Sequence, residues 1–342
     1  MKKFTDHIEI NDIAPETKVS LKDRIAVAII LILVGGPCLI IGNKLFFFFV
    51  LAVSLITCHE IVQVPNKLKE DKHNKIVYVF SYLMLFVLIF WYFIKNNISI
   101  LISTGDFKFD LLKSFSEPRV TLSGFCLCAG FFFLMVVIDK KFSIIDAFYF
   151  ITMLFVISIG LQSFLFLRYL PFNLYNVTFE ESDALFKFLQ SFGLIAYVVL
   201  GTLINDAGAY FVGILFGKNK MTSISPKKTW EGFVGGVIIS IIFSFSFCMI
   251  FSLCNIPILP FLDLKHWYNV LILSIFIPFI ATLGDLVFSS IKRQYGIKDF
   301  GTLLKSMGGI LDRLDSLLFV GTGVSLILLL MSHNWGILLW EN

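Results

Sequence analysis

Residues 225–254 read SPKKTWEGFVGGVIISIIFSFSFCMIFSLC. After Glu231 this stretch contains no charged residue. It is long enough to cross the hydrocarbon core of a bilayer, which takes about 17–25 residues at about 1.5 Å each. The rest of the chain has the same character, since 57% of its 342 residues are hydrophobic, 40 are Phe, 15% are charged, and the mean hydropathy is +0.87. This composition excludes an ordinary soluble domain and predicts an all-α polytopic membrane protein.

Similar apolar windows occur nine times along the chain, without an internal repeat or a low-complexity linker between them. The polar first 24 residues precede the first window, which lacks a small-residue cleavage site and so predicts an anchor rather than a signal peptide. The first two windows are so close together that we expect a helical hairpin. About nine transmembrane helices are therefore predicted, over residues 25–42, 45–63, 76–94, 121–138, 144–167, 190–216, 231–254, 269–291 and 314–331.

The distribution of Lys and Arg predicts the orientation in the membrane. The formal net charge of +4 is too small and too scattered to indicate nucleic-acid binding. If the N-terminus is cytoplasmic, five segments lie on that side and hold 20 of the 28 basic residues, as the positive-inside rule expects. Two of these segments have unusual sequences and could form one site. The five segments are residues 1–24, 64–75, 139–143, 217–229 and 292–313.

The Ser-Pro-Lys-Lys sequence before the seventh window suggests an anion site. Ser225 is a good N-cap and Pro226 fits the first helical position, so a helix is expected to begin there. Lys227 and Lys228 then lie in its first turn, where the helix dipole is already positive, and a bound anion would explain them. Other interpretations stay open: the lysines only flank a span, Trp230 is an interfacial residue, and Gly232, Gly235 and Gly236 only allow close helix packing.

Carboxylates inside apolar runs are the second unusual feature, because each costs at least about 2.5 kcal/mol near the middle of a bilayer. Asp285 is spaced i, i+4 and i+7 with Ser289 and Lys292 and so shares one helix face with them. Asp206 likewise shares a face with Tyr210.

Asp312 and Asp315 are i, i+3 neighbours at the start of the ninth window. A hard cation such as Mg²⁺ would relieve their repulsion, and a local salt-bridge cluster with Arg313 is the alternative. Glu60 and Asp146 are isolated near span ends, and for them we expect structural roles.

Two segments resemble the CDP-diacylglycerol synthase (phosphatidate cytidylyltransferase) family. They read SSIKRQYGIKDFGTLLKSMGGILDRLD (289–315) and NDAGAYFVGILFGKNKMTSISPKKTWEGFVGG (205–236), and the second is especially similar to eukaryotic members. The resemblance covers about residues 200–316. The chain departs from the family pattern in having Lys305 and Met307 where Pro and His are usual. The matching positions of the first segment are Ser289, Lys292, Arg293, Lys298, Asp299, Gly308, Gly309, Asp312, Arg313 and Asp315.

The resemblance implies transfer of CMP from CTP to phosphatidic acid, giving CDP-diacylglycerol and pyrophosphate. Together with the apolar windows and the basic segments, it predicts a cytoplasmic tail (1–24), about five N-terminal spans (25–189) and a catalytic region of about four spans (190–342) with cytoplasmic active-site loops. It further implies an endoplasmic reticulum membrane location and Mg²⁺, and it leaves open a second, monovalent cation and a homodimer. The alternatives are another CTP-dependent lipid enzyme, such as a dolichol or polyprenol kinase, and a non-enzymatic anion transporter.

The resemblance also implies roles for individual residues. Asp285, Asp312, Lys292 and Arg293 are expected to be catalytic, and Asp285, Asp312 and Asp315 to bind the metal. The expected substrate-binding residues are Asn205, Asp206, Ser225, Lys227, Lys228, Thr229, Glu231, Ser289, Lys298, Asp299 and Arg313.

Overall fold

A computed structural model describes residues 33–41, 43–65, 74–103, 118–174, 181–222, 224–225, 227–304 and 308–332 of the chain. Among these residues the secondary structure is helical, apart from two isolated β-bridges. Residues 33–41 form a short helical stretch. The longer helices are α2 (Asn43–Gln63), α3 (Lys75–Ser103), α5 (Pro118–Ile138), α6 (Ile144–Leu174), α7 (Glu181–Phe216), α8 (Trp230–Leu253), α9 (Trp267–Gln294) and α10 (Leu311–Ser332).

Among the described residues six helices are long and apolar enough to cross a membrane, which confirms the predicted all-α polytopic fold. The count of nine spans stays a prediction. Within α3 and α5, shorter apolar stretches are described over Lys75–Phe90 and Gly124–Ile138. The first predicted span and its hairpin turn lie partly outside the described residues. The six candidate spans are Leu45–Gln63, Ile144–Pro171, Phe188–Phe216, Trp230–Leu253, Trp267–Gln294 and Leu311–Met331.

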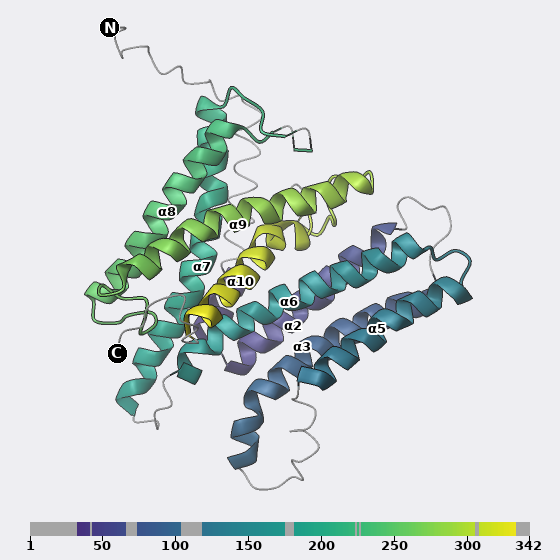
Figure 1. Ribbon diagram of the computed structural model, residues 1–342, viewed down its shortest axis with the longest axis horizontal. Helices are drawn as coiled ribbons and strands as arrows, with labels where there is room; N and C mark the ends of the chain where they lie inside the picture. Colours follow the sequence, from purple (N-terminus) through teal and green to yellow (C-terminus); the bar gives the residue numbers. More distant parts are fainter. Residues whose placement is uncertain are drawn as a thin grey trace.

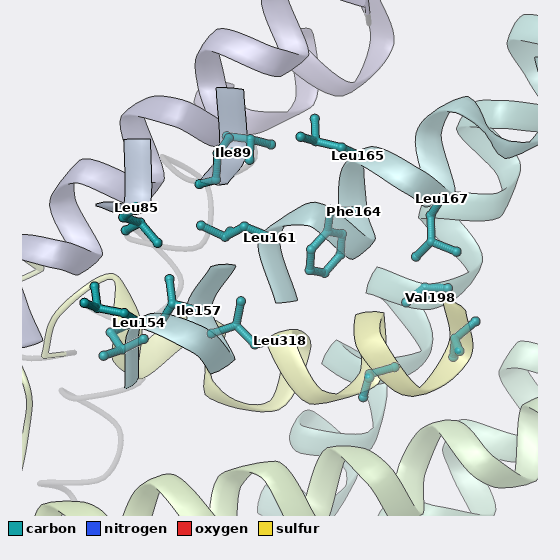
Figure 2. Close-up of a cluster of buried hydrophobic side chains, with 14 of the residues drawn as sticks. Leu85, Ile89, Leu154, Ile157, Leu161, Phe164, Leu165, Leu167, Val198 and Leu318 are labelled. Atoms are coloured by element: carbon teal, nitrogen blue, oxygen red, sulfur yellow. The ribbon is translucent and has the colours of Figure 1, made fainter. Parts of the chain in front are cut away.

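Helix α6 joins the two halves of the bundle (Figure 1). It packs against α2, α3 and α5 on one side and against α7 and α10 on the other. Between lipid-facing helices the stabilisation comes mainly from close van der Waals packing, which small residues allow. Gly160 of α6 is such a contact, because a Cβ there would lie 2.6 Å from Leu318 Cδ2 of α10. Figure 2 shows Leu318 beside the α6 side chains Leu154, Ile157 and Leu161 in this buried cluster.

Helices α7 and α8 make the most extensive contact in the bundle. Glycines line it on α8, and a Cβ at Gly236 would lie 2.7 Å from the Asn205 carbonyl oxygen of α7. At Gly232 a Cβ would lie 2.6 Å from the Ala209 carbonyl oxygen. The packing interpretation of the glycines after Glu231 is therefore confirmed, and the close contact holds the Asn205–Asp206 pair beside α8.

Helix α8 begins at Trp230, so the predicted helix start at Ser225 is wrong. The Lys228 amide donates to the Ser225 carbonyl oxygen at 3.0 Å and closes a turn instead. Thr229 is extended, forms a β-bridge with Lys220, and accepts a hydrogen bond from the Gly232 amide at 3.1 Å through its Oγ1. Thr229 is thus the N-cap, and both lysines precede the helix rather than occupy its first turn.

Candidate active site

Four carboxylates and two lysines meet where α7, α9 and α10 approach one another at one end of the bundle. Asp206 lies on α7, Asp285 and Lys292 lie on α9, and α10 carries two more aspartates near its start. The loop before α8 adds Lys228, which forms an ion pair with Asp285. The loops 217–229 and 292–313 therefore do contribute to one site, as the sequence predicted.

Lys292 is the buried cation of the site, with only 9% of its surface exposed. Its Nζ donates to Asp312 Oδ1 at 2.9 Å and lies 3.8 Å from Asp315 Oδ2. The same atom lies 5.5 Å from the centre of the Phe300 ring. A buried pair of this kind compensates the cost of removing both charges from water, and removing one partner leaves the other uncompensated.

Asp312 also organises the loop that precedes α10. Its Oδ2 accepts hydrogen bonds from the Phe300 amide at 2.9 Å and from the Gly309 amide at 2.8 Å. Gly308 has a φ of 83°, and a Cβ there would lie 2.8 Å from the same oxygen. Only glycine fits this position easily, because it lacks the Cβ and tolerates positive φ. Both Asp312 oxygens therefore have protein donors.

Asp285 is more exposed than the two aspartates of α10. Its Oδ1 accepts from Ser289 Oγ at 3.2 Å, and its side chain is 28% exposed. Gly284 brings α10 close to it, because a Cβ at Gly284 would lie 3.1 Å from the Asp315 carbonyl oxygen. The carboxylates of Asp206, Asp285 and Asp315 are consequently near enough to repel one another.

These residues fit a hard divalent cation by charge and donor type. If all four aspartates were ionised, they would carry four negative charges against two positive charges on Lys228 and Lys292. Carboxylate oxygens are the ligands that Mg²⁺ prefers, usually completed by water and substrate phosphates. Among the described residues no group of three or more His, Cys, Asp or Glu side chains is already arranged to hold a metal. Asp285 has fewer competing donors than Asp312, and in Asp315 the Oδ1 atom already accepts from the Ser316 amide and hydroxyl.

Several expected substrate-binding residues also stabilise the loop before α8. Glu231 accepts hydrogen bonds from the Lys218 and Asn219 amides, each at 3.2 Å, and from Asn219 Nδ2 at 2.7 Å. Thr229 caps α8 and Ser225 closes the preceding turn. These contacts hold Lys228 beside Asp285.

The remaining expected site residues divide between the interior and the surface. Asn205 is buried and its Nδ2 donates to Asp206 Oδ1 at 3.4 Å. Arg293 Nε donates to the Ile224 carbonyl oxygen and its Nη1 to the Ile297 carbonyl oxygen, both at 3.3 Å, so it connects the two loops. The residues at positions 305–307, including Lys305 and Met307, lie outside the described residues. Exposed side chains are found at Lys227, Lys298, Asp299 and Arg313.

The tyrosine that follows α9 is excluded as a general base. Burial, together with the nearby Asp146 carboxylate, raises the pKa of Tyr295 to about 12, so its phenol stays protonated at neutral pH. Asp146 itself has the structural role expected of it, because its Oδ2 accepts from the Ser143 amide and hydroxyl at 2.8 and 2.7 Å.

Glu60 reaches the site although the sequence analysis assigned it only a structural role. Its carboxylate, on α2, accepts hydrogen bonds from the first amides of α10. In the sequence, Glu60 was conspicuous only as a carboxylate in an apolar run without a neighbouring Lys or Arg. Its hydrogen-bond partners on α10 could not be identified without the fold.

Comparison with known proteins now connects this geometry to a family. The sequence profile of the Cytidylyltransferase family matches residues 22–331. The chain belongs to the cytidylyltransferase family. Phosphatidate cytidylyltransferase from Staphylococcus haemolyticus is 31% identical over 315 residues, covering 91% of this chain and 100% of that protein. The resemblance predicted from the 205–236 and 289–315 segments is confirmed.

Other relatives match mainly the part of the cytidylyltransferase that contains the site motifs. Phosphatidate cytidylyltransferase from Bacillus subtilis is 41% identical over 147 residues, which is 42% of this chain and 51% of that protein. The Mycobacterium tuberculosis protein of the same name is 36% identical over 140 residues, which is 41% of this chain and 39% of that protein. These alignments therefore span about half or less of those relatives. The expected nucleotidyltransferase class is confirmed, and neither the kinase nor the transporter alternative is favoured.

Proposed function

We propose that this cytidylyltransferase acts on phosphatidic acid, transferring CMP from CTP to form CDP-diacylglycerol and pyrophosphate. The observation that carries the proposal is the pairing of Lys228 with Asp285 and of Lys292 with Asp312 at one end of the membrane bundle. Two polyanionic substrates can meet only where fixed cations offset their repulsion. The names of the bacterial relatives supply the substrate class.

In the proposed reaction a phosphate oxygen of the lipid attacks the α-phosphorus of CTP. The new P–O bond forms as the bond between the α-phosphorus and the bridging oxygen breaks, and pyrophosphate leaves with that electron pair. A lipid phosphate already carries about −1.5 to −2 charges at neutral pH, so the attacking atom needs charge neutralisation and orientation more than a base. Lys228 can exchange Asp285 for a phosphate, whereas Lys292 holds the aspartates of α10 in place.

The proposal includes Mg²⁺ held by Asp285 and Asp315, with Asp206 beside them and Asp312 contributing through a second lone pair of an oxygen that already accepts from a protein donor. When bound, the cation would neutralise negative charge on the phosphate oxygens and on the leaving pyrophosphate. A second, monovalent cation is included in the proposal, because phosphates add to an already negative cluster. Removal of divalent cations by a chelator should abolish turnover, and Mg²⁺ should restore it. Full activity in excess chelator would contradict this part of the proposal.

The lipid substrate is proposed to approach between α8 and α9. An open, mostly apolar groove of about 350 Å³ lies there, and Phe233 and Phe279 form part of its wall. Leu286 and Ser290, which also line the groove, lie one residue from Asp285 and Ser289. An acyl chain in this groove would leave the phosphate of the same lipid near the carboxylate cluster.

We propose that the site faces the cytoplasm, because the loops around it belong to the basic segments of the chain. Cysteines introduced at Lys220 and Asn342 should show opposite accessibility to an impermeant reagent in sealed vesicles. Labelling of both cysteines from the same side would contradict this orientation. Location in the endoplasmic reticulum stays a prediction, since the relatives named above are bacterial. Assembly as a homodimer also stays a prediction.

The decisive experiment supplies the purified protein with labelled CTP and either phosphatidic acid or dolichol, followed by thin-layer separation of the lipids. When the α-phosphate of CTP carries the label, we expect a labelled lipid that comigrates with CDP-diacylglycerol. This product should form only with phosphatidic acid. Transfer of the γ-phosphate to dolichol would instead establish a kinase. No transfer to either lipid under conditions where the protein is folded would overturn the proposal.

A further inference from the structure

A carboxylate from the N-terminal half of the chain caps the helix that carries two site aspartates. Glu60 Oε1 accepts from the Ile310 amide and Oε2 from the Leu311 amide, both at 2.8 Å. Glu60 lies on α2 and is only 4% exposed, although 250 residues separate it from Ile310 in sequence. The first amides of a helix have no partner within the helix, and the dipole makes this end positive. A carboxylate with one oxygen for each amide satisfies both requirements.

The surrounding backbone leaves room for this carboxylate and little else. A Cβ at Gly309 would collide with both Glu60 oxygens, and one at Gly301 would lie 2.5 Å from Oε1. Both glycines belong to the loop that connects α9 to α10, so the loop closes around the carboxylate. The space between Gly301 and Gly309 therefore suits a carboxylate at the position of Glu60, with one acceptor oxygen for each amide.

The same loop is held from its other side by Asp312. The Gly309 amide donates to Asp312 Oδ2, while the next two amides donate to Glu60. Three successive amides are thereby divided between one carboxylate of the site and one from outside it. The two carboxylates are also near enough to repel each other. The position of the first turn of α10, and with it the direction of Asp312 toward Lys292, therefore depends on Glu60.

We propose that Glu60 is a positioning residue for nucleotide transfer. Its carboxylate holds the first turn of α10 so that Asp312 and Asp315 face Lys292 and the cation site. This inference rests on the proposed function, because positioning has a kinetic meaning only if the α10 aspartates take part in the transfer. Glu60 touches neither substrate nor reacting atoms, and it acts through the backbone of residues 309–311.

The test compares Glu60→Gln with Glu60→Asp and with Asp146→Asn. Gln has one acceptor oxygen and places an NH₂ group against the second amide, whereas Asp keeps both oxygens on a shorter side chain. Asp146 is a matched control, because it is 3% exposed and its carboxylate also accepts from a backbone amide at a helix start, but the helix is α6 rather than α10. The measurements are kcat, KM for CTP, and the Mg²⁺ concentration that gives half-maximal rate, with thermal unfolding recorded for each variant.

Glu60→Gln is expected to lower kcat about ten- to a hundredfold and to raise the half-maximal Mg²⁺ concentration, with Glu60→Asp between it and the wild type. Asp146→Asn should lower the unfolding temperature while leaving kcat and the half-maximal Mg²⁺ concentration near the wild-type values. Wild-type kcat and Mg²⁺ dependence in Glu60→Gln would overturn the inference. So would an equal change of both constants in Asp146→Asn, because the effect would then be a general loss of stability.

Amide hydrogen exchange provides a readout that does not need turnover. The peptide containing residues 308–316 should exchange faster in Glu60→Gln than in the wild type, and Mg²⁺ with CTP should protect it in the wild type only. If the wild type makes no CDP-diacylglycerol but residues 308–316 still exchange faster in Glu60→Gln, the proposed function is contradicted. The role of Glu60 in positioning α10 would then still hold. Identical exchange in the two proteins would refute the positioning role whatever the activity.

Discussion

The site contains two lysine–aspartate pairs in different surroundings. In the open pair, Lys228 and Asp285 have side chains that are 24% and 28% exposed, and the lysine comes from a loop. In the closed pair, the side chains of Lys292 and Asp312 are 11% and 4% exposed, and both residues lie on helices. Water weakens the attraction in the open pair, so its lysine can move to a phosphate at low cost. The closed pair instead sets the geometry of α10.

Breaking the closed pair should have the largest effect. Lys292→Met leaves the Asp312 carboxylate buried without its cation, which typically costs about 3–5 kcal/mol of stability. We expect loss of activity together with a large decrease in the unfolding temperature, measured in detergent micelles. The double variant Lys292→Met/Asp312→Asn should recover part of the stability but no activity. A fully active Lys292→Met protein would show that the pair is dispensable.

Neutralising one aspartate from each pair separates chemistry from stability. Asp285→Asn and Asp312→Asn should each abolish CDP-diacylglycerol synthesis, and the double variant should be little worse than either, because the carboxylates act as a unit. Only Asp312→Asn should also destabilise the protein, since it weakens acceptance from two backbone amides. Near-normal turnover in either variant would remove that residue from the reaction, and equal unfolding temperatures would contradict the difference between the pairs.

Removing the lysine of the open pair should affect substrate use more than stability. Lys228→Gln is expected to lower kcat/KM for CTP about ten- to a hundredfold, through lost charge-assisted hydrogen bonds to phosphate. KM for phosphatidic acid should change less. Lys227→Gln is the matched control, because its exposed side chain adjoins the same turn. Unchanged CTP kinetics in both variants would make both lysines flanking charges, and the nucleotide site would then be sought around Lys292, Arg293 and Lys298.

The smallest effect is expected where the two loops touch. Arg293→Lys keeps the charge but loses the planar group that bonds the Ile224 and Ile297 carbonyl oxygens. Activity should decrease by less than about tenfold, with the unfolding temperature almost unchanged, because carbonyl hydrogen bonds at an exposed position contribute little. Complete loss of activity would instead place Arg293 directly on a phosphate.

The sequence by itself determined that this is a helical membrane protein, because apolar windows and basic loops depend on composition along the chain. It also determined the family and the set of residues around Asp285 and Asp312, because two motifs agreed in order and spacing. Within a helix, spacing alone correctly placed Ser289 beside Asp285.

Only the tertiary structure decided which group contacts which across the bundle. Spacing could not show that Lys228 pairs with Asp285, that Thr229 rather than Ser225 caps α8, or that Glu60 caps α10. The reason is physical: the Lys228–Asp285 and Glu60–α10 contacts join segments whose relative positions depend on helix packing. The start of α8 depends instead on the turn at Ser225 and on the bridge between Thr229 and Lys220. A buried carboxylate signals in sequence that it needs a partner, but the fold alone supplies that partner.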